Sequence, residues 1–242
     1  MTGLQPPAAA VTRGVLVGAA AVATLAAWAA FARMALVTPH HHDATGRAFL
    51  ASVVMWQAMV VAMMTPTVLP WIAAYATLVA PADGSRNWRA IGAFTGGYFA
   101  VWLAYSAGAA WLQMGLARAG LLMGDRVSTT LGALVLVSAG AFQFVPLKGA
   151  CLAHCRNPLS YFLARWRNGP IGGFRLGVSH GAYCLGCCWL VMLTALAMGV
   201  MNLAWMAVLT VVVALEQVAP AGVWVGRAGG VLLIAWGAWL LA

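Results

Sequence analysis

The chain alternates long apolar runs with short polar segments that contain Pro, Gly, Arg or His residues. Several runs reach the length of about 20 residues that an α-helix needs to cross the hydrocarbon core of a bilayer. The pattern therefore predicts an all-α fold, a polytopic transmembrane helical bundle of about seven spans that forms one domain over residues 1–242. The predicted spans are residues 14–37, 49–80, 91–117, 127–147, 174–199, 203–217 and 221–242.

Interruptions within the apolar runs refine this prediction. Pro66 and Pro70 lie inside the second run, and because proline lacks a backbone donor they indicate a kinked or broken helix. Gly199 to Asn202 must form a turn, since the apolar stretch around it is too long for one crossing. Residues 159–175 mix arginine with aromatic and glycine residues, which indicates an amphipathic interfacial segment and then a flexible lead-in to the fifth span.

The composition supports a membrane protein and excludes several other classes. Hydrophobic residues make up 64% of the 242 positions and charged residues only 7%, whereas a water-soluble domain carries roughly 25% charged residues. The net charge of +9 comes from Lys and Arg residues confined between apolar runs, which is typical of membrane topology rather than of nucleic-acid binding. Acidic residues are few, and phosphate-loop and metalloprotease motifs are absent from the sequence, so a binding function is favoured over an enzymatic one.

The distribution of Lys and Arg also predicts an orientation. Seven crossings place most of these residues on the side of the N-terminus and leave the other side with Arg33, Arg47, Arg118 and Arg126. The positive-inside rule then predicts a multi-pass protein of a bacterial-type inner (plasma) membrane, with a cytoplasmic N-terminus and an outward C-terminus. The first run has a second interpretation as a signal peptide, because Ala30-Phe31-Ala32 resembles a cleavage site. The length of this first apolar run favours a membrane span that is not cleaved off.

The strongest candidate chemistry lies within the fifth predicted span, from His180 to Met192. On a helix that advances about 100° per residue, His180, Cys184, Cys187 and Cys188 occupy one arc, so three thiols and an imidazole face the same neighbour. Thiolate and imidazole are ligands that select soft metals such as copper(I) and zinc. The position of the cysteines along the run places them near the middle of the membrane. Cys184-Leu-Gly-Cys187 is also a Cys-x-x-Cys pair, which can cycle between dithiol and disulfide.

Two further segments carry soft ligands. Cys151, His154 and Cys155 lie close together in a segment expected to face the cytoplasm as a loop, where thiols stay reduced. Five cysteines also cannot pair completely. In the second span Met55, Met59 and Met63 recur every four residues and form one stripe. Methionine also fills gaps in ordinary cores, but together with thiolate it favours copper(I) over zinc, which seldom uses Met.

Two weaker features remain. His40, His41 and His42 form a short polar tract that is either a solvated turn or a metal-collecting segment. Glu216 is the sole glutamate and stands at the end of a predicted span, where an acidic group is a functional candidate. Its structural alternative is an ion pair with Arg227 or another cytoplasmic Arg.

Three motifs together resemble a known family. They are Met-Trp-x-x-Met-x-x-x-Met-Met-x-Pro at 55–66, Cys-x-x-His-Cys-Arg-x-Pro at 151–158 and Gly-x-x-Cys-x-Gly-Cys-Cys-Trp at 181–189. The chain from about residue 47 to 217 is similar to an uncharacterised prokaryotic family of predicted metal-binding integral membrane proteins. The resemblance implies a multi-span helical protein that binds metal and is concerned with copper delivery.

These observations leave three hypotheses in order of preference. The first is a soft-metal-binding membrane protein for transport of copper(I), with zinc as the second metal, or for its delivery to a partner protein. The second is a membrane thiol-disulfide oxidoreductase that uses Cys184 and Cys187. The third is a structural subunit of a membrane complex. The first hypothesis predicts that the second and fifth spans are neighbours and that the loop 151–155 folds beneath them.

Overall fold

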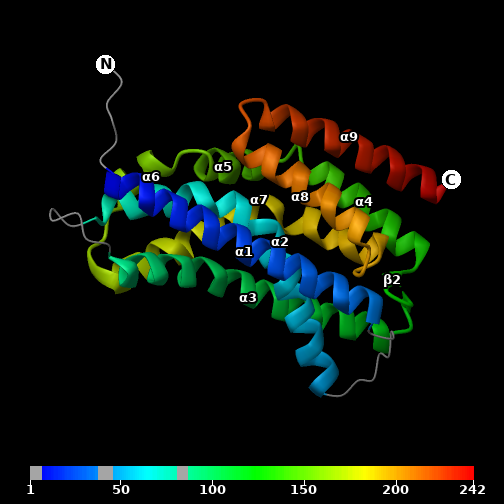
Figure 1. Ribbon diagram of the computed structural model, residues 1–242. Helices are drawn as coiled ribbons and strands as arrows, with labels where there is room; N and C mark the ends of the chain where they lie inside the picture. Colours follow the sequence, from blue (N-terminus) through cyan, green and yellow to red (C-terminus); the bar gives the residue numbers. More distant parts are fainter. Residues whose placement is uncertain (1–6, 38–45, 81–86) are drawn as a thin grey trace.

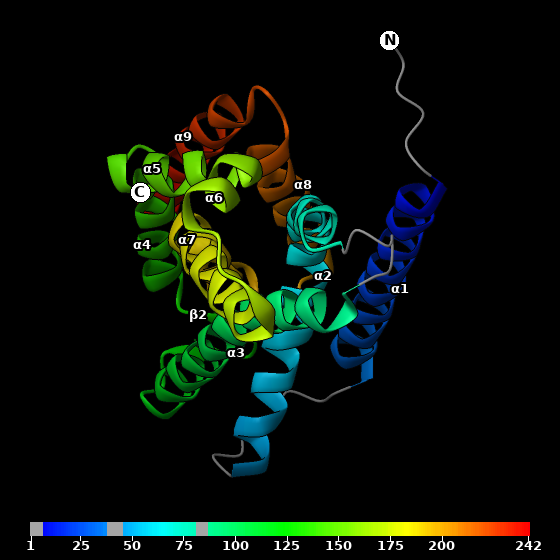
Figure 2. The same ribbon diagram turned by 90° about the vertical axis from the view of Figure 1, so that its left-hand side faces the viewer.

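Helices account for almost all of the structure. A computed structural model describes residues 7–37, 46–80 and 87–242 (Figure 1). Within these residues the helices pack lengthwise into a bundle, which confirms the all-α prediction (Figure 2). The elements are α1 (Pro7–Val37), α2 (Gly46–Leu78), α3 (Trp88–Arg118), β1 (Leu122–Met123), β2 (Arg126–Val127), α4 (Thr129–Phe142), α5 (Pro146–Cys155), α6 (Pro158–Arg165), α7 (Gly169–Met198), α8 (Leu203–Val218) and α9 (Gly222–Leu241).

Four helices of the described chain are long and apolar enough to cross a membrane. They comprise Gly14–Leu36 in α1, Ala48–Leu78 in α2, α7 and α9. The pair α4 and α5, bent by 67° at the break between them, counts as a fifth candidate if it is one span. Helix α3 is long but less apolar, and α8 has 16 residues, which rise about 24 Å against a hydrocarbon core of roughly 30 Å.

The second span was predicted to be a kinked or broken helix, and the structure has no break in it. Helix α2 runs without interruption through Pro66 and Pro70, although Figure 1 shows that it changes direction along its length. The hydroxyl of Thr65 donates to the carbonyl of Val61 at 2.6 Å, and that of Thr67 donates to the carbonyl of Met64 at 2.9 Å. The carbonyls that lose their donors to Pro66 and Pro70 are those of residues 62 and 66, so these bonds do not replace the missing ones. Threonine hydroxyls bonded to the preceding turn often accompany a bend in the helix.

Three other expectations about local structure need correction. The predicted span 127–147 is helical over α4 and the first two residues of α5, because β1 and β2 form a short antiparallel hairpin before α4 and the chain turns at residues 143–145. The expected loop 151–155 is the second half of helix α5, which starts with proline at its first turn. The expected flexible lead-in is part of helix α7, which begins at Gly169. The His40–His42 tract and residues 81–86 lie outside the described residues.

Close helix contacts explain why the glycine-rich start of α7 is ordered. Gly177 packs directly on the carbonyl of Phe94 in α3, and Gly97 of α3 packs on the carbonyl of Phe174 in α7. A side chain at either position would collide with the neighbouring backbone. Small residues allow such close approach between membrane helices. Gly92 and Gly96, by contrast, face open space.

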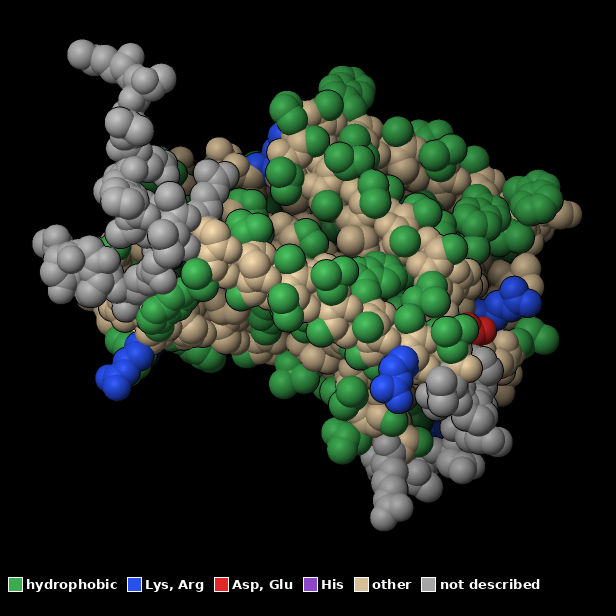
Figure 3. Space-filling view, in the orientation of Figure 1, with side chains coloured by type: hydrophobic (Ala, Val, Ile, Leu, Met, Phe, Trp, Pro, Cys, Tyr) green, Lys and Arg blue, Asp and Glu red, His purple; other side chains and the backbone are tan. Residues whose placement is uncertain are grey.

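The two ends of the bundle are distinguishable. Figure 1 shows the start of α1 together with α5 and α6 at one end, and β2 with the end of α9 at the other. The end with α5 and α6 carries the cations Lys148, Arg156 and Arg165. Apolar side chains and backbone cover most of the face in Figure 3, and the Lys and Arg side chains there are few. This surface matches the low share of charged residues in the sequence.

Candidate metal centre

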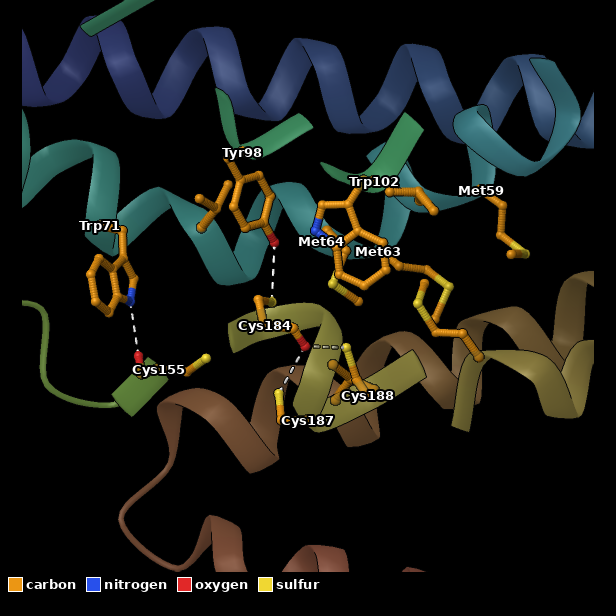
Figure 4. Close-up of a cluster of buried hydrophobic side chains, with 14 of the residues drawn as sticks. Met59, Met63, Met64, Trp71, Tyr98, Trp102, Cys155, Cys184, Cys187 and Cys188 are labelled. Atoms are coloured by element: carbon orange, nitrogen blue, oxygen red, sulfur yellow. Dashed lines mark hydrogen bonds between the residues drawn. The ribbon is translucent and has the colours of Figure 1, made fainter. Parts of the chain in front are cut away.

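Helix α7 presents its cysteines to the interior. Cys184, Cys187 and Cys188 are all buried (Figure 4). The thiols of Cys187 and Cys188 donate to the carbonyl of Cys184 at 3.0 Å and 2.9 Å. These bonds between neighbouring turns of the helix hold the sulfur atoms in fixed directions. The shared arc predicted for these residues is therefore a buried face of α7.

A fourth cysteine reaches this face from the end of α5. The sulfur atoms of Cys155, Cys184 and Cys187 all lie within 4.8 Å of one another, and all three residues are buried. We call these three side chains the thiol centre. Metal–thiolate bonds of about 2.3 Å would separate three trigonal sulfur atoms by about 4 Å. The five cysteines of the chain are free thiols, so the thiol centre fits a soft metal ion with only a small closure of its sulfur atoms.

Contacts on both sides of Cys155 explain its position. The indole nitrogen of Trp71 in α2 donates to the carbonyl of Cys155 at 2.8 Å. The next residue, Arg156, donates to the carbonyls of Glu216 at 3.1 Å and Pro220 at 3.0 Å. The end of α5 is thereby joined to α2 and to the end of α8. The sequence predicted Cys155 as a ligand, but Trp71 carried no signal of this role.

Two polar side chains that the sequence analysis missed contact the thiol centre. The hydroxyl of Tyr98 lies 3.3 Å from the sulfur of Cys184. The amide of Gln217 donates to the sulfur of Cys184 at 3.6 Å and to that of Cys187 at 3.9 Å. Donors of this kind stabilise thiolates and so favour metal binding by sulfur. The one available signal was that Gln217 is a polar residue at the end of an apolar run.

The two predicted histidines flank the thiol centre. His180 is buried and stacks on Trp71, with ring centroids 3.6 Å apart. His154 stacks on Tyr183 at 3.7 Å. Neither is within the group of side chains that meet at 4.8 Å. Each nevertheless has a buried ring nitrogen with no hydrogen-bond partner in the described part of the chain, Nδ1 of His180 and Nε2 of His154, which is uncommon for a buried polar atom.

The remaining predicted ligands lie outside the thiol centre. Cys188 is buried beside it, and Cys151 packs against Gly186. Met55, Met59 and Met63 are buried along α2, and Met64, which the sequence analysis did not select, is buried with them. Figure 4 shows Met59 far from Cys155, at the opposite side of the cluster. Met63 and Met64 are drawn between Met59 and the cysteines of α7 in the same view.

A buried ion pair lies close to the thiol centre. The ammonium of Lys148 in α5 and the carboxylate of Glu216 in α8 are 2.5 Å apart, with side-chain exposures of 2% and 4%. Lys148 also donates to the amide oxygen of Gln143. The ion-pair alternative for Glu216 is thus correct, but its partner is Lys148 rather than Arg227, whose guanidinium lies over Trp224.

Comparisons with known proteins identify the family. Searches of curated proteins and of solved structures found no match to this chain. The family model PpoB2, described as a copper chaperone, matches residues 53–240. This range includes α5, α7 and the thiol centre between them. Because the match extends over most of the sequence, the chain belongs to the PpoB2 copper chaperone family.

Proposed function

We propose that this protein binds copper(I) at the thiol centre, within a membrane-embedded helical bundle, and delivers the ion to a partner protein. The observation that carries the proposal is the convergence of three buried free thiols from two separate helices. Thiolates select soft metals such as copper(I) and zinc, and the family, which is one of copper chaperones, favours copper. Zinc usually takes four ligands in a closed site, whereas two or three thiolates suffice for copper(I).

The other predicted ligands extend this site into a route. His154 and His180 each keep a free ring nitrogen next to the thiol centre. Cys151 and Cys188 supply two more thiols beside it. Met55, Met59 and Met63 continue as soft, uncharged ligands along α2, and thioethers bind copper(I) weakly enough to release it. In this proposal the thiol centre holds the ion and the flanking groups receive or release it.

The orientation predicted from sequence is part of the proposal. The bundle has about seven spans in a bacterial-type plasma membrane, with α3, the pair α4–α5 and α8 counted among them. The end with α5 and α6 faces the cytoplasm, which is supported by the cations Lys148, Arg156 and Arg165 at that end. The thiol centre then receives copper(I) from a compartment that keeps thiols reduced.

Metal binding by matched variants tests the proposal. Protein purified without oxygen is loaded with copper(I), washed, and analysed for bound metal and free thiols. The triple variant Cys155→Ser, Cys184→Ser, Cys187→Ser is expected to retain no copper at concentrations that saturate the wild type. The control is Met201→Ser, which removes a sulfur atom outside the proposed ligands, in the turn after α7, and it should bind copper as the wild type does.

Two results would contradict this assignment. Equal copper in the triple variant and the wild type would remove the thiol centre from the binding site. A disulfide between Cys184 and Cys187 that forms and turns over with a quinone, with no bound copper, would instead favour a thiol oxidoreductase.

A further inference from the structure

A cationic pocket opens at the end of the bundle where α6 meets α7. It has a volume of about 740 Å³, and its lining consists of Tyr161, Ala164, Arg165, Trp166, Arg167, Arg175, Leu176 and Ser179. Pockets of about 300–1,000 Å³ typically hold small molecules rather than a protein surface. We call it the arginine pocket.

Three arginine side chains give the arginine pocket a positive charge. Arg165, Arg167 and Arg175 all line it. Among the described residues the ion pair is that of Lys148 with Glu216, so none of the three guanidinium groups is paired with a described carboxylate. A bare copper ion would be repelled by this charge, whereas an anion is attracted and held by the planar N–H donors of arginine.

Local contacts give the arginine pocket a defined shape. The turn between α6 and α7 is possible because Gly169 has a positive φ of 75° and because Gly172 packs on the carbonyl of Arg167. The hydroxyl of Tyr161 donates to the carbonyl of Leu176 at 3.2 Å. Burial raises the pKa of Tyr161 above its ordinary value although Arg165 and Arg167 lower it, so this hydroxyl remains a donor.

A short chain of contacts joins the arginine pocket to the thiol centre. The guanidinium of Arg165 donates to the hydroxyl of Tyr183 at 3.3 Å, and the ring of Tyr183 stacks on His154 at 3.7 Å. His154 directly precedes Cys155 of the thiol centre. An anion bound to Arg165 would therefore be linked through Tyr183 to His154, the neighbour of Cys155 in the sequence.

We propose that the arginine pocket receives copper(I) as an anionic complex with small thiols that carry carboxylates. This inference rests on the proposed function and names the form in which the metal arrives. Copper(I) in a reducing compartment is bound by thiolates, and two thiolates with their carboxylates give the complex a negative charge. Transfer breaks the copper–sulfur bonds of the carrier and forms bonds to the cysteines. The cysteine thiols give up their protons, the released carrier thiolates take up protons, and copper stays in oxidation state +1.

The test compares a copper(I) carrier whose thiol ligands have carboxylates with one whose ligands have none. Stopped-flow experiments measure the initial rate of copper(I) transfer to the full-length protein in phosphatidylcholine nanodiscs, from the glutathione complex, whose ligands carry carboxylates, and from the 2-mercaptoethanol complex, whose ligands carry none and whose negative charge comes from the two thiolates alone. The variant is Arg165→Gln, Arg167→Gln, Arg175→Gln. Its control is Arg89→Gln, Arg118→Gln, Arg126→Gln, which removes the same charge from exposed positions elsewhere. We expect the pocket variant to receive copper from glutathione about tenfold more slowly or worse, with the same final copper content and an unchanged rate from 2-mercaptoethanol.

The outcomes separate this inference from the proposed function. If neither carrier loads the wild type, the proposed function fails and this inference fails with it. If copper binds but the pocket variant and its control behave alike, or if both carriers slow equally, only the arginine pocket is wrongly assigned. Native mass spectrometry adds a further arm. One outcome would overturn the inference in favour of an acidic lipid headgroup. In that outcome the wild type retains phosphatidylglycerol, the pocket variant loses it, and the rate of copper transfer does not depend on the carrier.

Discussion

The imidazole of His180 lies flat against the indole of Trp71, with ring centroids 3.6 Å apart and ring planes inclined by 18°. The indole nitrogen of Trp71, at the edge of the ring, donates to the carbonyl of Cys155. One side chain of α2 thus contacts both α7 and the end of α5, the two helices that supply the thiol centre. Rigid support of this kind fixes ligand positions before the metal binds.

We expect Trp71→Phe to weaken copper binding and stability together. Phenylalanine keeps an aromatic ring against His180 but removes the donor to Cys155. A buried carbonyl left without its donor costs about 1–3 kcal/mol. Detergent-titration unfolding should show this loss, and competition with a copper(I) chelator should show weaker binding. Trp111→Phe is the control because Trp111 is 73% exposed, and a similar loss in that variant would contradict the role of Trp71.

Tyr98→Phe tests the hydroxyl next to Cys184. In the proposed copper-loaded protein Cys184 is a thiolate, and it would accept a hydrogen bond from the hydroxyl of Tyr98. Hydrogen bonds to charged groups contribute about 1.5–3 kcal/mol, so the affinity for copper(I) should fall about tenfold to a hundredfold. The matched control is Tyr105→Phe, because the hydroxyl of Tyr105 donates to the carbonyl of Trp189 and not to a cysteine. Equal affinities in the two variants would show that the hydroxyl of Tyr98 does not act on the copper site.

The helix period was sufficient to place Cys184 and Cys187 on one buried face, because positions on a single helix follow from geometry alone. It also grouped Cys188 with them, but the structure leaves that sulfur outside the thiol centre. The copper prediction agrees with the family to which the chain belongs. The second and fifth spans, predicted to be neighbours, meet through the side chains of Trp71 and His180, while α2 packs mainly against α1, α3 and α8.

Long-range contacts were beyond the reach of the local pattern. The partner of Glu216 could not be chosen among the cations, because the bend between α4 and α5 that brings Lys148 to it depends on tertiary packing. The glycine-rich stretch before the fifth span suggested flexibility, because the sequence pattern does not show which helix packs against it. Its glycines are ordered by their contacts with α3, as Gly177 and Phe94 show.

Gly177→Ala is expected to destabilise the interface between α3 and α7. The added methyl group would meet the carbonyl of Phe94, which cannot move without its helix. Overpacking of this kind costs about 1–3 kcal/mol, and thermal unfolding should show a lower midpoint. Gly96→Ala is the control, since its methyl group meets no atom within 4 Å, and its midpoint should equal or exceed that of the wild type. A stable Gly177→Ala variant would mean that the two helices pack less closely.

The ion pair of Lys148 and Glu216 predicts a non-additive result. Lys148→Met leaves the carboxylate of Glu216 buried without a cation, and Glu216→Leu leaves the ammonium of Lys148 buried alone. Removing one partner of a buried pair costs about 3–5 kcal/mol, whereas replacing both by apolar residues is often neutral. We therefore expect each single variant to unfold at a much lower detergent fraction than the wild type, and the double variant to be more stable than either single one. If the losses of the single variants simply add in the double variant, the two side chains stabilise the fold through separate contacts rather than as a pair.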